Sequence, residues 1–505
     1  MKIFKKIFSK AALVFLAIVL QVLPIVFFLY YFADLWWQLQ LAFQILAILL
    51  AIVIINKKEN PEFKAPWLII ILLFPIFGVI IYLLFANHYT RPRDARLTRK
   101  VHKGIKEALG QQASNNQPME DFLTIGNYIE NLLPYRGTKN NNVIFFPDGQ
   151  SFFDDLFVQL EKAEKFIFME YFIIGKGVIW NRIHEILQQK VKQGVEVRLI
   201  YDDIGSTFNL RNGYYKTLRK EGIKCHKFNP FRPLVSGIYN NRDHRKICVI
   251  DHRYAYTGGI NLADEYANIN APFGYWKDTG VRITGVAVKN FIAMFLSIYD
   301  IASKTITNYL PYLEGNYPDL SEDGFTLPFS DGPRPFYQEN IAENVITSMI
   351  NGAKKEIYIS TPYLIPPYRL LESIRAAALK GLDVRIIVPS IPDKKIIYMM
   401  SKSNFETLIE AGAKIYYFKP GFNHAKCILI DDQLALVGTI NLDFRSLVHH
   451  YEDGVLLYKT SCIKDISNDF LAMLNKSEIV TKSNFKFNVF LRLMSSILKL
   501  FSSLL

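Results

Sequence analysis

Long apolar stretches are confined to the beginning of the chain. Three of them, residues 11–33, 35–55 and 65–86, each approach the roughly 20 residues that a helix needs to cross a bilayer. No comparable stretch follows residue 90. A secretory signal would have one shorter apolar segment and a small-residue cleavage site, so the pattern predicts a retained anchor of two to three transmembrane helices.

After residue 140 the chain alternates amphipathic stretches with short apolar runs, and it does so twice. The two halves begin with similar tetrapeptides at 146–149 and 329–332, and they later share the apolar segments 194–200 and 381–387. In each half the order is helix, strand, helix, strand, which is typical of helices packed on a mostly buried sheet. The sequence therefore predicts a duplicated α/β unit.

These patterns divide the chain into five segments. We expect a membrane anchor, a basic juxtamembrane linker, two similar α/β lobes and a C-terminal amphipathic helix, which cover residues 1–90, 91–140, 141–320, 321–480 and 481–505. The last segment has apolar residues at helical spacing, so it either lies in the membrane interface or docks on the lobes.

The element that matches best between the two halves carries polar residues just before an apolar run. Both copies have the form H-x-K-x4-D, made of His244, Lys246 and Asp251 in the first half and His424, Lys426 and Asp431 in the second. An asparagine follows each histidine by 17 residues, at Asn261 and Asn441. This agreement in spacing indicates a pair of related sites rather than coincidence.

The residue types of the motif suit chemistry on a phosphodiester. The apolar end of each motif predicts a buried strand, on which residues i and i+2 share a face, so each histidine lies beside its lysine. An imidazole can attack phosphorus or donate a proton, while the ammonium offsets charge on the phosphate oxygens. Two such pairs provide the two proton-transfer partners that displacement through a covalent intermediate needs.

The remaining polar residues have less certain roles. Asp251 and Asp431 follow their histidines by seven residues, about 23 Å along an extended strand, so a turn or cap is favoured over contact with the same phosphate. Asn261 and Asn441 are either turn residues or phosphate ligands. A catalytic histidine also needs a partner that fixes its tautomer. The matched candidates are Asp278 and Glu452, because each precedes a valine by three residues.

Composition and charge narrow the function further. The chain has 505 residues, 50% of them apolar, and four cysteines, which excludes a disordered or disulfide-stapled protein. The cysteines have no paired spacing and are interpreted as reduced. No H-E-x-x-H or C-x-x-C motif accompanies the histidines, so neither a metal nor another cofactor is expected.

The net charge of +13 suggests nucleic acid as a partner at first sight. The clusters of Lys and Arg lie beside the apolar segments, however, and there each charge adds about 1 kcal/mol of attraction to anionic lipid. Three such clusters cannot all face one side of a membrane that is crossed three times. The topology therefore stays open, and a cytoplasmic location of the lobes is favoured.

Paired H-x-K-x4-D motifs with downstream asparagines resemble the phospholipase D superfamily, and the whole chain is similar to the bacterial cardiolipin synthases within it. The resemblance implies two phospholipase D-like lobes that form one active site behind the anchor. It implies phosphatidyl transfer between two phosphatidylglycerol molecules, which gives cardiolipin and glycerol without ATP or metal. All six motif residues would then belong to the catalytic set, with His244 as the nucleophile that forms a phosphohistidine and His424 as the general acid and base.

Other functions share the same motifs. A phospholipase D that transfers to water, or a phosphatidyl transferase with another alcohol acceptor, would look alike at the site, and the anchor and whole-chain resemblance favour cardiolipin synthesis in the cell membrane. A nuclease is disfavoured by the apolar segments. A catalytically silent lipid-binding scaffold would have degraded motifs, whereas both copies are intact.

Overall fold

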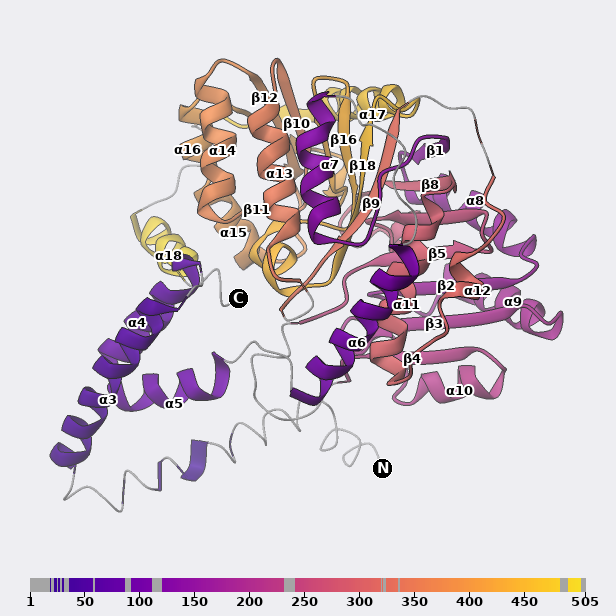
Figure 1. Ribbon diagram of the computed structural model, residues 1–505. Coiled ribbons are helices and arrows are strands. Elements are labelled where there is room, and N and C mark those ends of the chain that lie inside the picture. Colours follow the sequence, from indigo (N-terminus) through magenta and orange to yellow (C-terminus); the bar gives the residue numbers. More distant parts are fainter. Residues whose placement is uncertain are drawn as a thin grey trace. The chain divides into compact units, whose positions relative to one another are not determined.

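The computed structural model in Figure 1 describes most of the chain. The described residues are 36–57, 60–86, 92–110, 120–230, 241–318, 320, 324–334, 337–481 and 489–500, with positions 19, 22–24, 26, 27 and 30. The chain forms two compact units. The first consists of residues 1–90, 230–241 and 497–505, and the second, which contains both lobes, consists of 91–229 and 242–496.

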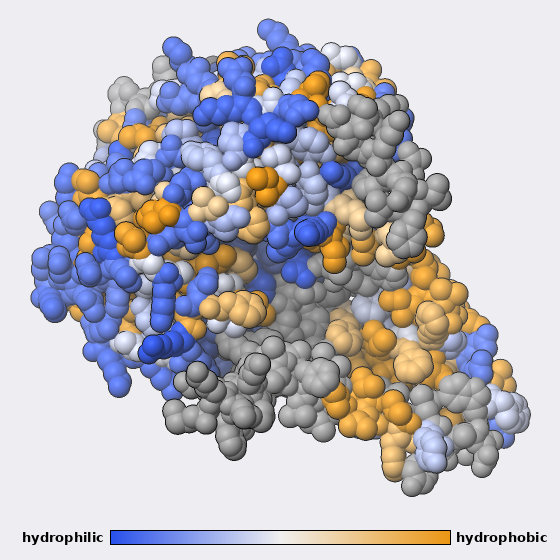
Figure 2. Space-filling model, turned by 180° about the vertical axis from the view of Figure 1, so that it is seen from behind, coloured by the Kyte–Doolittle hydropathy of each residue, from blue (hydrophilic) through white to orange (hydrophobic). Residues whose placement is uncertain are grey.

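The first unit is built from the apolar helices α3 (Trp36–Asn56), α4 (Pro61–Leu73) and α5 (Pro75–Phe85). The helices pack around a small cluster that includes Ile54, Trp67 and Val79. Many of their large apolar side chains remain exposed, and Figure 2 shows hydrophobic residues gathered on these helices. In the described part of the chain, residues Trp37–Asn56 form the one helix that is long and apolar enough to cross a membrane.

The prediction of a single spanning helix over residues 65–86 is wrong. The stretch divides at Phe74, where the backbone leaves the helical region with φ −129° and ψ 72°. Pro75 is the physical reason, because proline has no N–H to donate and disfavours helical geometry at the residue before it. A Cβ on Gly78 would lie only 2.4 Å from the Ile70 carbonyl oxygen, so α5 approaches α4 closely. The first expected span, residues 11–33, lies mostly outside the described residues.

The second unit contains two sheets of the same topology. The sheet of lobe 1 has the order β1-β8-β6-β5-β2-β3-β4, and that of lobe 2 has the order β19-β13-β12-β10-β15-β16-β18-β9. Read in opposite directions, seven strands correspond one to one, and β19 is an added edge strand. In lobe 1 the motif strand β5 lies between β6 and β2, and in lobe 2 the motif strand β15 lies between β16 and β10. All four pairings are antiparallel, and β2 and β10 each begin the parallel part of their sheet. Two duplicated α/β lobes are therefore confirmed.

The strands of lobe 1 are β1 (Asn141–Phe146), β2 (Phe166–Tyr171), β3 (Glu196–Asp202), β4 (Lys224–Phe228), β5 (Lys246–Ile250), β6 (Tyr254–Gly258), β7 (Tyr275–Lys277) and β8 (Gly280–Gly285). Those of lobe 2 are β9 (Phe325–Asp331), β10 (Glu356–Ser360), β11 (Leu364–Ile365), β12 (Asp383–Pro389), β13 (Lys414–Phe418), β14 (Gly421–Asn423), β15 (Cys427–Ile430), β16 (Leu434–Gly438), β17 (Leu442–Asp443), β18 (Glu452–Tyr458) and β19 (Ser477–Ile479).

Helices cover both faces of the sheets. The helices of the two lobes are α8 (Gly149–Glu161), α9 (Val178–Lys192), α10 (Tyr214–Lys220), α11 (Val288–Ser303), α12 (Leu310–Leu313), α13 (Ile341–Gly352), α14 (Tyr368–Leu379), α15 (Lys395–Ser403), α16 (Phe405–Glu410) and α17 (Ile463–Asn475), with short helical turns at Asp264–Ala267 and Arg445–His449. A further helix, α18 (Val489–Leu500), follows them in the chain. Helix α18 lies in the segment predicted to be a C-terminal amphipathic helix.

The motif strand of lobe 1 divides its side chains between two cores. On β5, Ile247 and Val249 belong to a large core shared with α11 and lobe 2, whereas Cys248 and Ile250 belong to a second core under α8 and α9. This alternation follows from the two-residue period of a strand. It explains why the motif strands read as continuous apolar runs, since both of their faces are buried.

The segment predicted as a basic linker, residues 91–140, is part of the lobed unit. It contains α6 (Pro92–Leu109) and α7 (Glu120–Leu132). Helix α6 buries Val101 and Ile105 in the large core while its basic residues face outward, and Ile129 of α7 joins the same core. The prediction of a linker is corrected here, because the helical spacing of these apolar residues gives both helices a face that packs on the lobes.

Candidate active site

The two histidine motifs lie where the lobes meet. His244 and His424 come just before the central strands β5 and β15, and each lysine Nζ donates a hydrogen bond to the carbonyl of its own histidine. The backbone N–H of His244 donates to the Tyr451 carbonyl over 2.9 Å, and that of His424 donates to the Lys277 carbonyl over 2.7 Å. Each motif therefore begins against a segment of the opposite lobe.

Both histidines receive their carboxylate from the other lobe. Nδ1 of His244 lies 2.9 Å from both carboxylate oxygens of Glu452, and Nδ1 of His424 lies 2.6 Å from Oδ2 of Asp278. A carboxylate accepts, so Nδ1 of each ring is the donor and Nε2 keeps its lone pair. The structure thus brings the two predicted tautomer-fixing residues to the histidines and pairs them across the lobe interface.

Burial sets the charges of the site. Both carboxylates are fully buried, and the two histidines are only 7–8% exposed. Desolvation lowers the pKa of His244 to about 3 and that of His424 to about 4, so both rings are neutral at neutral pH before substrate binds. Burial alone would raise the pKa of Glu452, but the adjacent His244 ring holds it well below its usual range.

The lysines connect the two motifs electrostatically. Burial lowers the pKa of Lys246 to about 8 and that of Lys426 to about 7. Lys246 also contributes to the lowered pKa of His424, so the two motifs belong to one site. The arrangement presents two neutral imidazoles and two poorly solvated ammonium groups, which is a site prepared for an anion.

Asp251 and Asp431 lie at the opposite end of the motif strands from the histidines. Asp251 accepts hydrogen bonds from the backbone N–H groups of residues 164–166, and Asp431 accepts the equivalent three from residues 354–356. Their inclusion in the catalytic set is corrected accordingly: their carboxylates fasten the end of the motif strand to the start of its neighbour. Both have a positive φ, 55° and 53°, which aspartate tolerates in a turn.

This geometry predicts a stability effect for the Asp431→Asn enzyme. Loss of the charged acceptor of three N–H groups should lower the free energy of unfolding by about 1–2 kcal/mol and leave turnover within about twofold. Asparagine also tolerates the positive φ. The measurement is the thermal unfolding midpoint of purified protein. The control is Asp432→Asn, an exposed neighbour with a similar φ of 50°, and equal midpoints for the two variants would contradict the prediction.

The asparagines occupy equivalent places but differ in their contacts. Asn261 accepts from the Ile173 N–H over 2.9 Å and donates to the Tyr266 hydroxyl over 2.7 Å. These bonds use its oxygen and one amide proton, so its placement matches the turn-residue alternative better than that of a phosphate ligand. Asn441 is buried, and its Oδ1 has no hydrogen-bond partner within the described part of the chain. Its amide stays a candidate for substrate contact.

The surroundings of the two histidines are unlike each other, which the sequence did not reveal. The His424 ring is surrounded by Tyr266, Trp276 and Phe422, with ring centroids 5.3–5.7 Å away. The His244 ring instead lies 5.1 Å from Phe172 and 5.5 Å from His450. The sequence pattern gives His450 no role, because it has no histidine counterpart in the other half of the chain. Its position two residues before Glu452 was the available signal.

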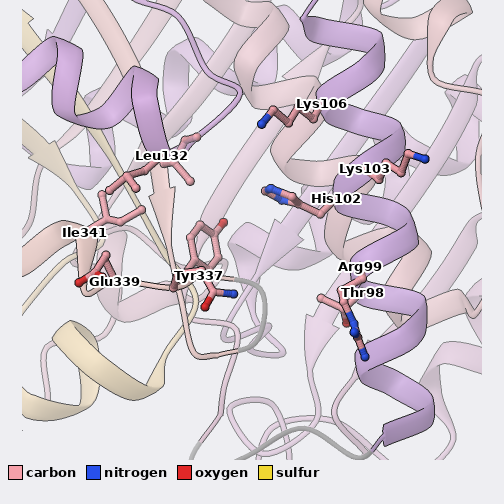
Figure 3. A pocket seen from close by; sticks show the side chains of 11 residues that line it. Thr98, Arg99, His102, Lys103, Lys106, Leu132, Tyr337, Glu339 and Ile341 are labelled. Carbon is pink, nitrogen blue, oxygen red and sulfur yellow. The ribbon is translucent and has the colours of Figure 1, made fainter. Parts of the chain in front are cut away.

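A separate cavity lies between α6, the end of α7 and residues 337–341. Its volume is about 290 Å³, and its walls include Arg99, His102, Lys103 and Lys106 from α6 and Glu339 opposite them. Figure 3 shows His102 and Lys106 pointing from α6 toward this space. The cavity does not contain the motif residues, so it is distinct from the candidate active site.

Two α/β lobes with a His–Lys pair from each at their interface define a phospholipase D-like protein. Residues 156–276 and 346–474 match the family model described as "Cardiolipin synthase, PLD-like domain", and residues 45–87 match "Phospholipase_D-nuclease N-terminal". A cardiolipin synthase of Alkalihalophilus pseudofirmus is 34% identical over 478 residues, which covers 92% of this chain and 94% of that protein. The chain belongs to the cardiolipin synthase family and is a phosphatidyltransferase enzyme.

Two further proteins are similar to this chain over most of their length. An uncharacterized protein of Streptococcus mutans is 41% identical over 458 residues, covering 90% of this chain and 98% of that protein. The crystal structure of phosphatidylserine synthase from Haemophilus influenzae Rd KW20 aligns with a TM-score of 0.56 at 17% identity, covering 76% of this chain and 98% of that chain. At this identity the second similarity concerns the fold alone.

Proposed function

We propose that this enzyme transfers a phosphatidyl group between two phosphatidylglycerol molecules, giving cardiolipin and free glycerol through a phosphohistidine intermediate. The observation that carries the proposal is the crossed pairing of His244 with Glu452 and of His424 with Asp278. It gives two imidazoles, each with Nδ1–H fixed on a carboxylate and Nε2 available for chemistry. Family membership favours phosphatidyl transfer over other reactions of such a site.

In the first step, Nε2 of His244 attacks the phosphorus of one phosphatidylglycerol, and the P–O bond to its glycerol breaks. The bound phosphodiester anion favours protonation of His424, whose Nε2–H then passes to the departing glycerol oxygen. Lys246 and Lys426 offset the charge that develops on the non-bridging oxygens. The phosphatidyl group is left on His244.

In the second step, Nε2 of His424 takes the proton of the incoming glycerol hydroxyl, which belongs to a second phosphatidylglycerol. The hydroxyl oxygen attacks phosphorus, and the bond to His244 breaks. If water took that place, the product would be phosphatidic acid, and another alcohol would give another phospholipid. The acceptor that occupies the His424 side therefore decides among the alternative reactions.

The direct test supplies purified enzyme with vesicles of labelled phosphatidylglycerol, without nucleotide and with chelator present. We expect equal amounts of cardiolipin and glycerol. Phosphatidic acid as the sole product would identify a hydrolase. A requirement for a cytidine nucleotide donor would overturn the proposed mechanism.

The pKa of Lys426 predicts the alkaline limb of activity. A lysine whose pKa is lowered to about 7 by burial loses its charge as pH rises through that value, and kcat/KM should fall with it. The charged groups that act on this lysine are Asp278, Lys246, Glu452 and Asp443. In Lys426→Arg the guanidinium stays charged, so the alkaline limb should move up by about one pH unit, to the pKa of about 8 that burial gives Lys246, even if the maximum is lower. If the alkaline limb of kcat/KM stays at the same pH in Lys426→Arg, the limb arises from the titration of another group.

We also propose that the basic face of α6 contacts anionic phospholipid. Arg99, Lys103 and Lys106 are exposed and border the cavity of Figure 3. With about 1 kcal/mol of attraction for each charge near an anionic surface, replacement of all three by Gln should raise the apparent KM for phosphatidylglycerol in mixed micelles about 100-fold. A matched triple variant at the exposed Lys192, Lys220 and Lys380 removes the same charge elsewhere. Equal effects of the two triples would indicate net charge alone.

A further inference from the structure

A third histidine at the candidate active site has no role in the proposed reaction. His450 is 8% exposed, and its ring lies 5.5 Å from that of His244. Among the residues that the structure describes, neither of its ring nitrogens has a hydrogen-bond partner, and Nδ1 lies 3.6 Å from Oε1 of Glu452. Buried polar groups are rarely left unpaired, so this imidazole points to a ligand.

A comparison of the two lobes shows that a second histidine is present in only one half of the site. Trp276 precedes Asp278 by two residues, as His450 precedes Glu452, and its ring lies 5.3 Å from His424. The half-site of His424 therefore has an indole where that of His244 has a second imidazole. Among the residues that the structure describes, His244, His450 and Glu452 are the one buried group of three potential metal ligands.

The spacing of the three side chains fits a small divalent ion. Their ligand atoms all lie within 4.8 Å of one another. Oε1 of Glu452 is 2.9 Å from Nδ1 of His244 and 3.6 Å from Nδ1 of His450. Two histidines and a carboxylate are an established donor set for zinc, and tetrahedral bonds of about 2.1 Å place donors roughly 3.4 Å apart. Small side-chain movements suffice to reach that geometry.

We propose that His244, His450 and Glu452 bind a Zn²⁺ ion and that this ion inhibits the enzyme. The zinc ion forms a bond to Nδ1 of His244 and displaces its hydrogen bond to Glu452. The ring proton then resides on Nε2, so the ring stays neutral and no net proton is lost. Nε2 has no lone pair left for attack on phosphorus. The inhibition rests on the proposed role of His244, whereas the binding of zinc does not.

The first experiment measures binding without turnover. Calorimetric titration of Zn²⁺ into the full-length His424→Ala protein should give one site per chain, because all three ligands remain. Adding His450→Asn to that protein should weaken zinc binding by on the order of 10–100-fold. The control replaces another histidine, His226 on β4, with Asn in the same protein, and this change should leave the affinity for zinc unchanged. Equal affinity with and without His450 would overturn the proposal whatever reaction the enzyme catalyses.

The second experiment measures phosphatidyl transfer at buffered free Zn²⁺. The wild-type enzyme should be inhibited, and the inhibition curve of His450→Asn should shift to about tenfold higher zinc or more. The comparison uses each variant's own zinc-free rate, so a lower basal rate does not affect it. The His226→Asn curve should coincide with wild type. Binding by calorimetry without inhibition would place the ion at His450 but reject the proposed role of His244.

Discussion

His244→Ala and His424→Ala enzymes are each expected to lose phosphatidyl transfer by at least about 10³-fold, and to fail at different steps. Without His244 no covalent bond to the enzyme forms. Without His424 the nucleophile remains, but neither the leaving glycerol nor the incoming hydroxyl has its proton partner. The two losses are therefore distinguishable by what accumulates on the protein.

A phosphodiester with a nitrophenolate leaving group separates the two steps, because that leaving group departs without a proton. With a labelled phosphatidyl moiety, His424→Ala should become labelled and stay labelled, whereas His244→Ala should remain unlabelled. Label on His244→Ala alone would reverse the assignment. If wild-type enzyme is active but no labelled protein is found when the reaction is quenched during turnover, the acceptor attacks the substrate phosphorus directly, without a covalent enzyme intermediate.

Folding has to be controlled in this experiment, since Ala at 244 removes the histidine that donates to the buried Glu452 carboxylate and leaves the Thr439 hydroxyl as a donor to it. Removing a hydrogen-bond donor from a buried carboxylate is destabilising. His244→Gln retains a hydrogen-bond donor for Glu452 and serves as the second variant. Circular dichroism and the thermal unfolding midpoint should match wild type before the labelling result is interpreted.

Glu452→Gln and Asp278→Asn are expected to lower kcat by about 10²–10⁴-fold with little change in the fold. An amide can donate to Nδ1, which moves the ring proton to Nε2 and removes the lone pair needed there. Because each carboxylate serves the histidine of the other lobe, Glu452→Gln should block the first step, which uses His244. Asp278→Asn should block the second step, which uses His424. Glu452→Gln should abolish labelling by the nitrophenyl substrate, and Asp278→Asn should retain it.

If Glu452→Gln kept the labelling and Asp278→Asn lost it, each histidine would depend on the carboxylate of its own lobe. Asp453→Asn is the matched control, since Asp453 is buried beside Glu452 but bonds to the Thr257 hydroxyl rather than to a histidine. Burial raises its pKa to about 7, so the neutral amide is a mild change. We expect its turnover to stay within about threefold of wild type.

The motif and the duplication were readable because they depend on local spacing. A histidine and a lysine at i and i+2 on a buried strand share a face in any fold that keeps the strand. Likewise Asp251 and Asp431, seven residues further on, had to lie at the far end of it. The two apolar strand faces could be anticipated from the continuous apolar run, and the two lobes from the repeat.

Errors arose where local pattern and tertiary packing compete. The apolar residues 65–86 have the composition of a spanning helix, but Pro75 divides them into α4 and α5. The basic segment before lobe 1 reads as a solvated linker by charge. Its sparse apolar positions, among them Val101 and Ile105, are nevertheless enough to dock α6 on the lobes.

By itself, the sequence determined that this protein has two similar α/β lobes, each with a His–Lys pair, behind an apolar N-terminal region. The tertiary structure decided which carboxylate serves which histidine, because Glu452 and Asp278 reach the site from opposite lobes. It also placed His450 next to His244 and Trp276 next to His424. Residues about 150 to 200 positions apart meet only when two lobes pack, and no local period of the chain encodes that contact.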